Sequence, residues 1–286
     1  MLALLLLACS ANGDLQCTED PGYAASATAL AALDHANCYR DAMGLAPGLL
    51  DPVVDDATQA HADYMEANRR LDHQELDGEA GFTGEWVWDR LESAGYPLEN
   101  GSGWSEVLAE GDGATGSVDR WINSVYHRIP FTMPDWRDVG FGQADVYTGM
   151  TFVTEYPARG RSAVLYPADG QARVPTTFDS DSEWPDPAPD QRLVGPPITL
   201  TVGDDQAGAN GENPYGLELV SASLIGPDGA VEFLTLTPSD DDFLQSTVAL
   251  VPTAPLTPDT DYDVELTVSW GGSEETVSGR FSTAQE

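Results

Sequence analysis

The sequence contains no lysine: its 12 basic residues are all arginine, against 48 aspartates and glutamates. The formal net charge of −36 repels a phosphate backbone, which argues against a nucleic acid as a partner. Anionic lipid headgroups are disfavoured for the same reason, so we expect contact with a membrane only through a lipid anchor. Neutral, apolar and cationic molecules remain as partners.

Several catalytic motifs are also missing. The sequence has no P-loop, no glycine fingerprint of dinucleotide-binding folds, no HExxH and no G-x-S-x-G. These absences argue against most nucleotide, nicotinamide, zinc-peptidase and α/β-hydrolase functions. The apolar run of residues 1–8 falls far short of the roughly 20 residues that span a bilayer. It is typical of the end of a secretory signal segment.

Cysteine is scarce, with only Cys9, Cys17 and Cys38. The segment Leu6-Leu7-Ala8-Cys9 resembles a bacterial lipobox, in which the cysteine becomes the lipidated first residue; a plain signal peptide with an incidental cysteine is the alternative. If Cys9 carries lipid, Cys17 and Cys38 remain either as one disulfide in an oxidising compartment or as two free thiols. We therefore expect an extracytoplasmic protein, secreted or lipid-anchored to the cell envelope at the outer membrane or cell surface.

Hydrophobic periodicity separates a helical first half from a β-rich second half. Helices are predicted over residues 26–43, 52–71, 83–94 and 117–126, and strands over 138–146 and 150–156, joined by a turn at 147–149. Further strands are predicted over 198–202, 217–224, 231–236 and 247–251, with a hairpin from Val264 through Gly271-Gly272 to Phe281.

These patterns divide the chain into five parts. They are a lipoprotein signal remnant (1–9), a tether (10–22), a first domain of helices and strands (23–158), a proline-rich linker or edge segment (159–197) and an all-β domain (198–286).

A series of short motifs in the first domain carries most of the functional information. In chain order it comprises Asn37 with Arg40, His61 to Met65, Leu71-Asp72-His73, Phe82-Thr83-Gly84, Asp89-Arg90, Ala94-Gly95-Tyr96, Trp104 to Ala109, Val118 to Ser124, His127-Arg128 and Val139 to Gly142. In this order and spacing the series resembles the bacterial branch of the CAP superfamily, the secreted cysteine-rich, antigen 5 and pathogenesis-related proteins. The resemblance covers about residues 27 to 156 and implies an α+β fold, a three-layer α-β-α sandwich around a small antiparallel sheet.

The resemblance also implies a central cavity that carries two histidines and two acidic residues. His73 matches the first family histidine, Glu106 matches the glutamate of the family's Gly-Glu-Asn segment, and His127 matches the second histidine. The fourth position falls near Ser124, which is not acidic. Two imidazoles and a carboxylate can hold zinc or another divalent metal with an open water position. The alternatives are a metal-free hydrogen-bonded group and a purely structural role.

The other histidines and the tryptophans have simpler interpretations. His35 and His61 lie in predicted helices and are expected to pack or to lie at the surface. Trp86 and Trp88 are two positions apart, so on a helix they cannot share a face. We expect one of them to be exposed or to line a groove. Neither Ser105 nor Ser124 lies in a recognisable nucleophile motif.

The second domain resembles the Ig-like modules of bacterial surface proteins. Residues 256–264, L-T-P-D-T-D-Y-D-V, are similar to their L-x-P-x-T-x-Y-x-V run, and Phe281-Ser282-Thr283 matches the closing F-x-T. The resemblance implies an all-β Ig-like sandwich that serves as a spacer or docking module.

Three functions fit these features. We favour a secreted or lipid-anchored protein that binds a small apolar, lipid or peptide ligand in the CAP cavity, with or without a metal at His73, Glu106 and His127, rather than an enzyme. The second is a metal-dependent hydrolase or peptidase that uses the same three residues. The third is a structural surface protein whose Ig-like domain mediates adhesion.

Overall fold

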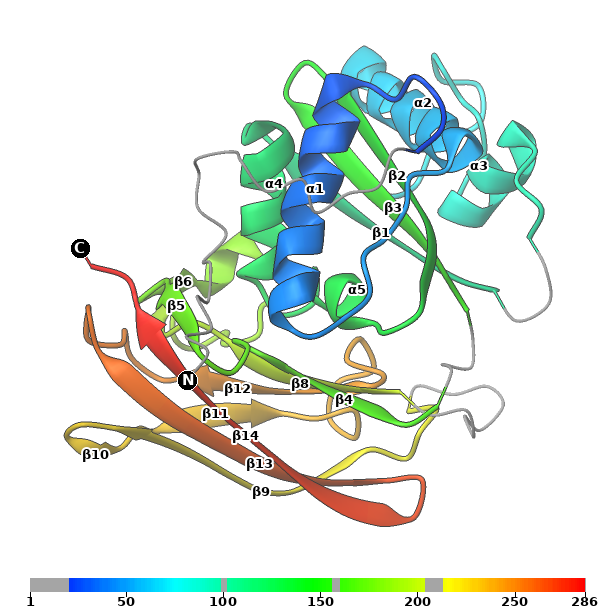
Figure 1. Ribbon diagram of the computed structural model, residues 1–286. Helices are drawn as coiled ribbons and strands as arrows, with labels where there is room; N and C mark the ends of the chain where they lie inside the picture. Colours follow the sequence, from blue (N-terminus) through cyan, green and yellow to red (C-terminus); the bar gives the residue numbers. More distant parts are fainter. Residues whose placement is uncertain (1–20, 99–101, 156–159, 204–212, 286) are drawn as a thin grey trace.

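The structure is a computed structural model that describes residues 21–98, 102–155, 160–203 and 213–285. An α+β region ending at Glu155 is followed by a mostly β region of several sheets (Figure 1). In the described ranges, no helix is both long enough and apolar enough to cross a membrane.

Local sequence chemistry explains where the longer helices begin and end. The first begins after Ser26, whose hydroxyl accepts a hydrogen bond from the Ala29 N–H, and the second after Asp51, with proline at its first position. Gly95 ends the third helix in the left-handed conformation that glycine tolerates best. The helices are α1 (Ala27–Ala42), α2 (Pro52–Asn68), α3 (Val87–Ala94), α4 (Gly113–Ile122) and α5 (Ile129–Thr132).

The α+β region has three layers. Its strands are β1 (Ser102–Glu110), β2 (Trp136–Ala144) and β3 (Tyr147–Glu155), which form an antiparallel sheet of order β1-β3-β2. Helices α1 and α4 cover one face of this sheet, and α2 and α3 cover the other (Figure 1). The side chains of neighbouring residues in β3 point to opposite faces of the sheet. Phe152 packs in the core beside α1 and α4, and Val153 packs in the core beside α2 and α3. The predicted three-layer arrangement is therefore observed.

The C-terminal region contains two larger sheets and a two-stranded one. Its strands are β4 (Ser162–Tyr166), β5 (Gln171–Val174), β6 (Phe178–Asp179), β7 (Leu193–Val194), β8 (Ile198–Gly203), β9 (Glu218–Gly226), β10 (Gly229–Ala230), β11 (Phe233–Leu236), β12 (Thr247–Pro252), β13 (Asp261–Trp270) and β14 (Ser273–Thr283). The sheet orders are β10-β9-β13-β14-β5, β11-β12-β8-β4 and β6-β7. The two larger sheets share a hydrophobic core, to which Leu200, Leu250 and Leu266 contribute. The narrower assignment to an Ig-like module stays a prediction.

The two regions pack tightly against each other. Val125 and Ile129, which follow α4, share a hydrophobic core with Val194, Ala249 and Val251 of the C-terminal region. Polar contacts reinforce this core, since Arg128 donates to the carbonyl of Pro197 at 2.8 Å and Thr132 lies 2.7 Å from Thr201 through their hydroxyls.

Residues 160–197 lie in the segment predicted to be a proline-rich linker or edge segment, and they contain several strands. They supply β4 and β5, each of which pairs at the edge of one of the two larger sheets, and the β6-β7 pair. Parts of this segment therefore form edge strands of the two larger sheets.

The predicted elements of the first region differ from the observed ones in several places. The helix predicted over 117–126 is observed as α4 over Gly113–Ile122, and α5 has no counterpart among the predicted helices. The β2-β3 turn lies at Asp145 and Val146 rather than at 147–149, and Asp145 takes a positive φ of 48°. Residues 83–86 precede α3 instead of forming its first turn. The strand β1 has no counterpart among the predicted elements, although its residues belong to one of the motifs.

Candidate functional site

A buried ion pair lies at the centre of the candidate site. Glu106 is on β1, the edge strand of its sheet, and its side chain meets Arg90 of α3, with Arg90 Nη2 2.6 Å from Glu106 Oε1. Both side chains are almost fully buried. Arg90 Nη1 also donates to the carbonyl of His73 at 3.0 Å, which fixes the loop after α2 against α3.

The second oxygen of Glu106 positions His73. His73 Nδ1 lies 2.9 Å from Glu106 Oε2, and because a carboxylate only accepts, this nitrogen carries a proton. In the neutral ring, Nε2 is then an acceptor. The His73 side chain is 49% exposed, whereas that of Glu106 is 3% exposed. The imidazole is therefore the accessible end of a buried charged group.

His61 joins the same group, although the sequence indicated only a packing role for it. Its Nδ1 lies 2.8 Å from Glu75 Oε1, and its Nε2 lies 3.0 Å from the carbonyl of Asp72 and 3.8 Å from Glu106 Oε2. Both ring nitrogens thus face acceptors. Arg90 lies beside both buried carboxylates, with its Nε 3.9 Å from Glu75 Oε1 and its Nη2 2.6 Å from Glu106 Oε1.

The pKa values of the two glutamates reflect this pairing. Burial raises the pKa of Glu106, but the charge of Arg90 and the hydrogen bond from His73 outweigh burial and lower it to about 2. Burial also raises the pKa of Glu75, and the hydrogen bonds from His61 and from the Thr83 N–H lower it below its ordinary value. Both carboxylates are therefore ionised at neutral pH.

Three tryptophan rings, here called the tryptophan surface, adjoin this group: Trp86, Trp88 and Trp104. Trp104 and Glu106 are two residues apart on β1 and share a face of the sheet. The ring centroids of Trp86 and Trp88 are 5.8 Å apart, and those of Trp88 and Trp104 are 6.0 Å apart. Trp88 is 37% exposed and Trp104 is 43% exposed. The site thus combines an open aromatic surface with one accessible imidazole.

The stacking of Trp86 on Trp88 corrects the prediction that the two rings cannot share a face. That argument assumed that both residues are helical. Trp86 instead precedes α3 with an extended backbone, and its N–H donates to the Asp89 carboxylate at 3.0 Å. The rings are therefore free to stack, with an interplanar angle of 17°.

His127 has a different partner from the one predicted. Its Nδ1 lies 2.8 Å from Glu183 Oε1, in the C-terminal region. Glu183 also accepts hydrogen bonds from the backbone N–H groups of Val125, Tyr126 and His127. The structure therefore brings His73 and Glu106 together and places His127 at the junction of the two regions. Ser124 is also separate, because its hydroxyl donates to the carbonyl of Trp121 at 2.8 Å.

These contacts do not fit the predicted metal. Among the described residues, no group of three or more His, Cys, Asp and Glu side chains could hold a metal ion. At Glu106, one carboxylate oxygen already faces the guanidinium of Arg90, whose positive charge disfavours a divalent cation beside it. We therefore derive no function from a metal held by His73, Glu106 and His127.

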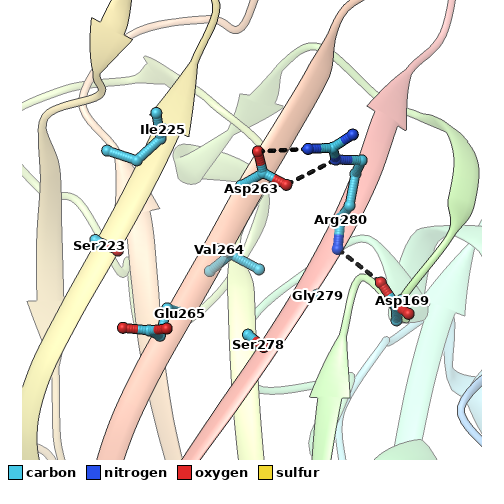
Figure 2. A pocket seen from close by; sticks show the side chains of 9 residues that line it. All are labelled: Asp169, Ser223, Ile225, Asp263, Val264, Glu265, Ser278, Gly279 and Arg280. Carbon is cyan, nitrogen blue, oxygen red and sulfur yellow. Dashed lines mark hydrogen bonds and ion pairs between the residues drawn. The ribbon is translucent and has the colours of Figure 1, made fainter.

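A surface depression lies on the outer face of the five-stranded sheet, away from this site (Figure 2). Arg280 pairs there with Asp263 through two hydrogen bonds of 2.7 and 2.8 Å, and its backbone N–H donates to Asp169. Both charges of the exposed Arg280–Asp263 pair are already matched. This depression therefore has less to offer a ligand than the site around His73 and the tryptophan surface.

The sequence analysis missed Glu75, Arg90 and Glu183 as functional residues. Arg90 lies in the Asp89-Arg90 motif, and Glu75 follows His73 by two positions, so the motifs could have indicated both residues. No motif indicated Glu183, because it lies in a segment predicted to be a linker. Cys9 and Cys17 lie outside the described residues, so the lipidation of Cys9 and the disulfide between Cys17 and Cys38 stay predictions.

Comparisons with known proteins agree with the first region of the fold. Residues 33–156 match the family model of CAP, the cysteine-rich secretory protein family. No curated protein matches the chain. Among solved structures, it is similar to an extracellular protein with an SCP domain from Bacillus anthracis, at 19% identity and a TM-score of 0.40, over 45% of this chain and 40% of that chain. It is also similar to an outer surface protein from Borrelia burgdorferi, at 17% identity and a TM-score of 0.36, over 44% of this chain and 90% of that chain.

Proposed function

We propose that the CAP domain formed by residues 33–156 binds a small apolar or lipid ligand on the tryptophan surface, with His73 as the polar contact. The observation that carries this proposal is the contact between three tryptophan rings, two of them more than a third exposed, on the face of β1 that also holds Glu106. Aromatic rings offer large apolar areas at little entropic cost, so they favour flat or aliphatic ligands. A peptide with an apolar side chain could occupy the same surface.

The ion-pair group determines which polar group of the ligand is favoured. Glu106 holds the proton on Nδ1 of His73, which leaves Nε2 to accept a hydrogen bond. A ligand hydroxyl can donate that bond, and a carboxylate cannot. The net charge of −36 also disfavours an anionic ligand. We therefore expect an apolar alcohol to bind more tightly than a fatty acid of similar size.

Titration of the protein with a fluorescently labelled sterol and a labelled fatty acid tests this function. We expect saturable binding of the sterol, and weakening by about fivefold or more in Trp88→Ala and in Trp104→Ala, because each change removes an exposed aromatic contact worth about 1 kcal/mol. Leu30→Ala, at an exposed apolar position of α1 on the opposite side of the sheet, is the matched control. Equal sterol affinity in all three variants and the wild type would overturn the proposal.

A general-base function of His73 is the second candidate. The hydrogen bond that His73 Nδ1–H donates to Glu106 orients the ring and leaves Nε2 free, as in hydrolases whose base is held by a carboxylate. The candidate needs turnover of an ester or peptide library that is lost in His73→Ala. If the wild type shows no turnover, the general-base function is ruled out and only the binding function remains.

We also propose that the protein is extracytoplasmic and anchored through Cys9, with the C-terminal region as a spacer or docking module. The lipobox-like segment Leu6-Leu7-Ala8-Cys9 supports this proposal. Metabolic labelling with a fatty-acid analogue should mark the wild type and not Cys9→Ser. Equal labelling of both would contradict the anchor.

A further inference from the structure

A second group of aromatic rings, here called the junction aromatics, lies where the two regions meet: the partly buried Tyr126 and the exposed Trp184 and Phe243. Trp184 is 79% exposed and Phe243 is 53% exposed. The ring centroids of Trp184 and Phe243 are 5.7 Å apart at 75°, and those of Tyr126 and Phe243 are 6.1 Å apart at 68°. Three loops distant in sequence thus bring together rings that stand nearly perpendicular to their neighbours, and two of the three rings, Trp184 and Phe243, remain open to solvent. Large apolar side chains left so exposed are typical of binding surfaces.

Carboxylates surround these rings. Asp241 Oδ2 accepts a hydrogen bond of 2.5 Å from the Tyr126 hydroxyl, and its Oδ1 accepts one of 3.0 Å from the Phe243 N–H. Burial raises the pKa of Tyr126 far above its ordinary range, and Asp241, Glu183 and Asp186 add to the rise. Asp186 lies two residues after Trp184, and Glu183 accepts a hydrogen bond of 2.8 Å from the Tyr126 N–H.

Two of these carboxylates lack a counterion in the described part of the chain. Glu183 faces His127, but none of the described arginines lies within ion-pair distance of Asp186 or Asp241. The nearest arginine in sequence to Asp186, Arg192, pairs instead with Asp179 and Asp181. The junction aromatics therefore carry an unbalanced negative charge, in contrast to the tryptophan surface, where Arg90 lies beside the buried Glu75 and Glu106.

Exposed aromatic faces beside unbalanced carboxylates favour one class of ligand. Ring faces attract cations, and they attract weakly hydrated organic cations best, because a small metal ion gains nothing from a ring that replaces its water ligands. A quaternary ammonium group has the required charge, an apolar surface and no hydrogen-bond donors to satisfy. An uncharged apolar ligand would leave Asp186 and Asp241 unmatched.

We propose that Trp184 and Phe243, with Tyr126, Asp186 and Asp241, form a binding site for a quaternary ammonium group. This site is separate from the tryptophan surface and does not depend on the function proposed there. Because it is an open surface, the expected dissociation constant is in roughly the millimolar range. Its residues come from both regions, so occupancy links the two.

Titration of the full chain with choline chloride tests the proposal, with sodium chloride lowered in step to keep the salt concentration constant. The indole N–H signals report each tryptophan separately by NMR, and the signal missing from Trp184→Leu identifies Trp184. We expect a saturable shift of the Trp184 signal. The signals of Trp88 and Trp104 should stay in place, so a failure here is distinct from a failure of the proposed function.

Matched ligands and variants test the chemistry. The neutral isostere 3,3-dimethyl-1-butanol has the shape of choline without its charge, and we expect it to bind at least about fivefold more weakly. Phe243→Leu and Asp186→Asn should weaken choline binding by about twofold to fivefold. Leu193→Ala, at an equally exposed apolar position, should leave it unchanged. No shift of the Trp184 signal, or equal binding of choline and its isostere, would overturn the proposal.

Two sources could supply such a group, and sedimentation with vesicles distinguishes them. Binding to phosphatidylcholine vesicles that is lost in Trp184→Leu supports a lipid headgroup. Choline binding without vesicle binding supports a free small molecule. Phosphatidylglycerol vesicles, which carry no quaternary ammonium group, provide the control, and equal binding to both lipids would count against the site.

Discussion

At the scale of single residues, the pair of Glu106 and Arg90 determines the properties of the candidate site. Burying a charge is costly unless a partner compensates it, and here the two charges lie 2.6 Å apart in an almost fully buried setting. The pair also anchors the loop of His73, since Glu106 holds the imidazole and Arg90 holds the His73 carbonyl. The orientation of the exposed ring therefore depends on side chains that no ligand touches.

Glu106→Gln should destabilise the protein by about 3 kcal/mol, because it leaves Arg90 buried without its countercharge. Urea denaturation of the variant and the wild type measures the difference. Glu92→Gln, at an exposed position of α3, is the matched control and should change stability by less than about 0.5 kcal/mol. Similar small effects of both substitutions would show that the pair adds little.

The stabilising effect of Glu106 should depend on pH. Its pKa falls from an ordinary 4.5 to about 2 in the folded protein, so its contribution is complete above about pH 4.5 and is lost as pH falls toward 2. The size of the shift corresponds to about 3 kcal/mol. The stability gap between wild type and Glu106→Gln should shrink to roughly half between pH 6 and pH 3. A gap that stays constant over this range would contradict the assigned pairing.

The sequence predicted the contact of His73 with Glu106 through motifs that keep their order and spacing. It could not predict the partner of His127, because Glu183 lies 56 residues further along the chain in a segment whose prolines suggest a linker. It also could not predict that His61 would bind Glu75, since a histidine on a helix is compatible with both packing and pairing. Residue patterns therefore did not predict the contacts of the site that join segments distant in the sequence.

At the scale of elements, β8 shows why alternation of apolar and polar residues is not enough to predict which side chains face solvent. In β8, Ile198, Leu200 and Val202 face the core between the two larger sheets, as alternation predicts. The intervening Thr199 and Thr201 suggest a solvent-facing side, yet both are buried and contact Arg128 and Thr132 of the first region. Polar side chains that form hydrogen bonds across an interface have the same sequence pattern as polar side chains that form hydrogen bonds with water. The sequence therefore cannot tell the two apart.

The contact between α2 and β2 depends on two glycines of the Val139 to Gly142 motif. A Cβ atom at Gly142 would lie 2.3 Å from the carbonyl oxygen of Thr58, and one at Gly140 would lie 2.4 Å from that of Val54. Gly142→Ala should therefore destabilise the protein by about 2 kcal/mol, because the helix backbone must move away from the strand.

Thermal unfolding measures this effect. Gly116→Ala, within α4, is the control, because its Cβ would meet only the Asp112 side chain, at 3.2 Å, and alanine favours a helix. We expect it to be neutral or slightly stabilising. If both substitutions had the same effect, the close approach of α2 to β2 would not explain why glycine is needed at position 142.

At the scale of the whole molecule, the two regions share a core and several buried hydrogen bonds. The shared core includes Val125 and Ile129 on one side and Ala249 and Val251 on the other. Arg128 is fully buried at this junction, where its guanidinium lies 4.2 Å from the ring centroid of Tyr166. An interface this apolar and this well satisfied is expected to unfold together with the regions that it joins.

Calorimetry should therefore show one main unfolding transition for the full chain. Glu183→Ala, which leaves three N–H groups and His127 without their acceptor, should lower its midpoint and separate the regions into two transitions. Two separate transitions in the wild type would contradict a shared core.

The most direct test of the central claim compares His73→Ala with His127→Ala in binding of the labelled sterol. The two histidines were predicted to share one cavity; in the structure His73 contacts Glu106, whereas His127 contacts Glu183. We predict that His73→Ala weakens sterol binding by about fivefold, because one accepted hydrogen bond is lost, and that His127→Ala lowers thermal stability without changing the affinity. An equal loss of affinity in both variants would contradict the account and would place the ligand between the two histidines.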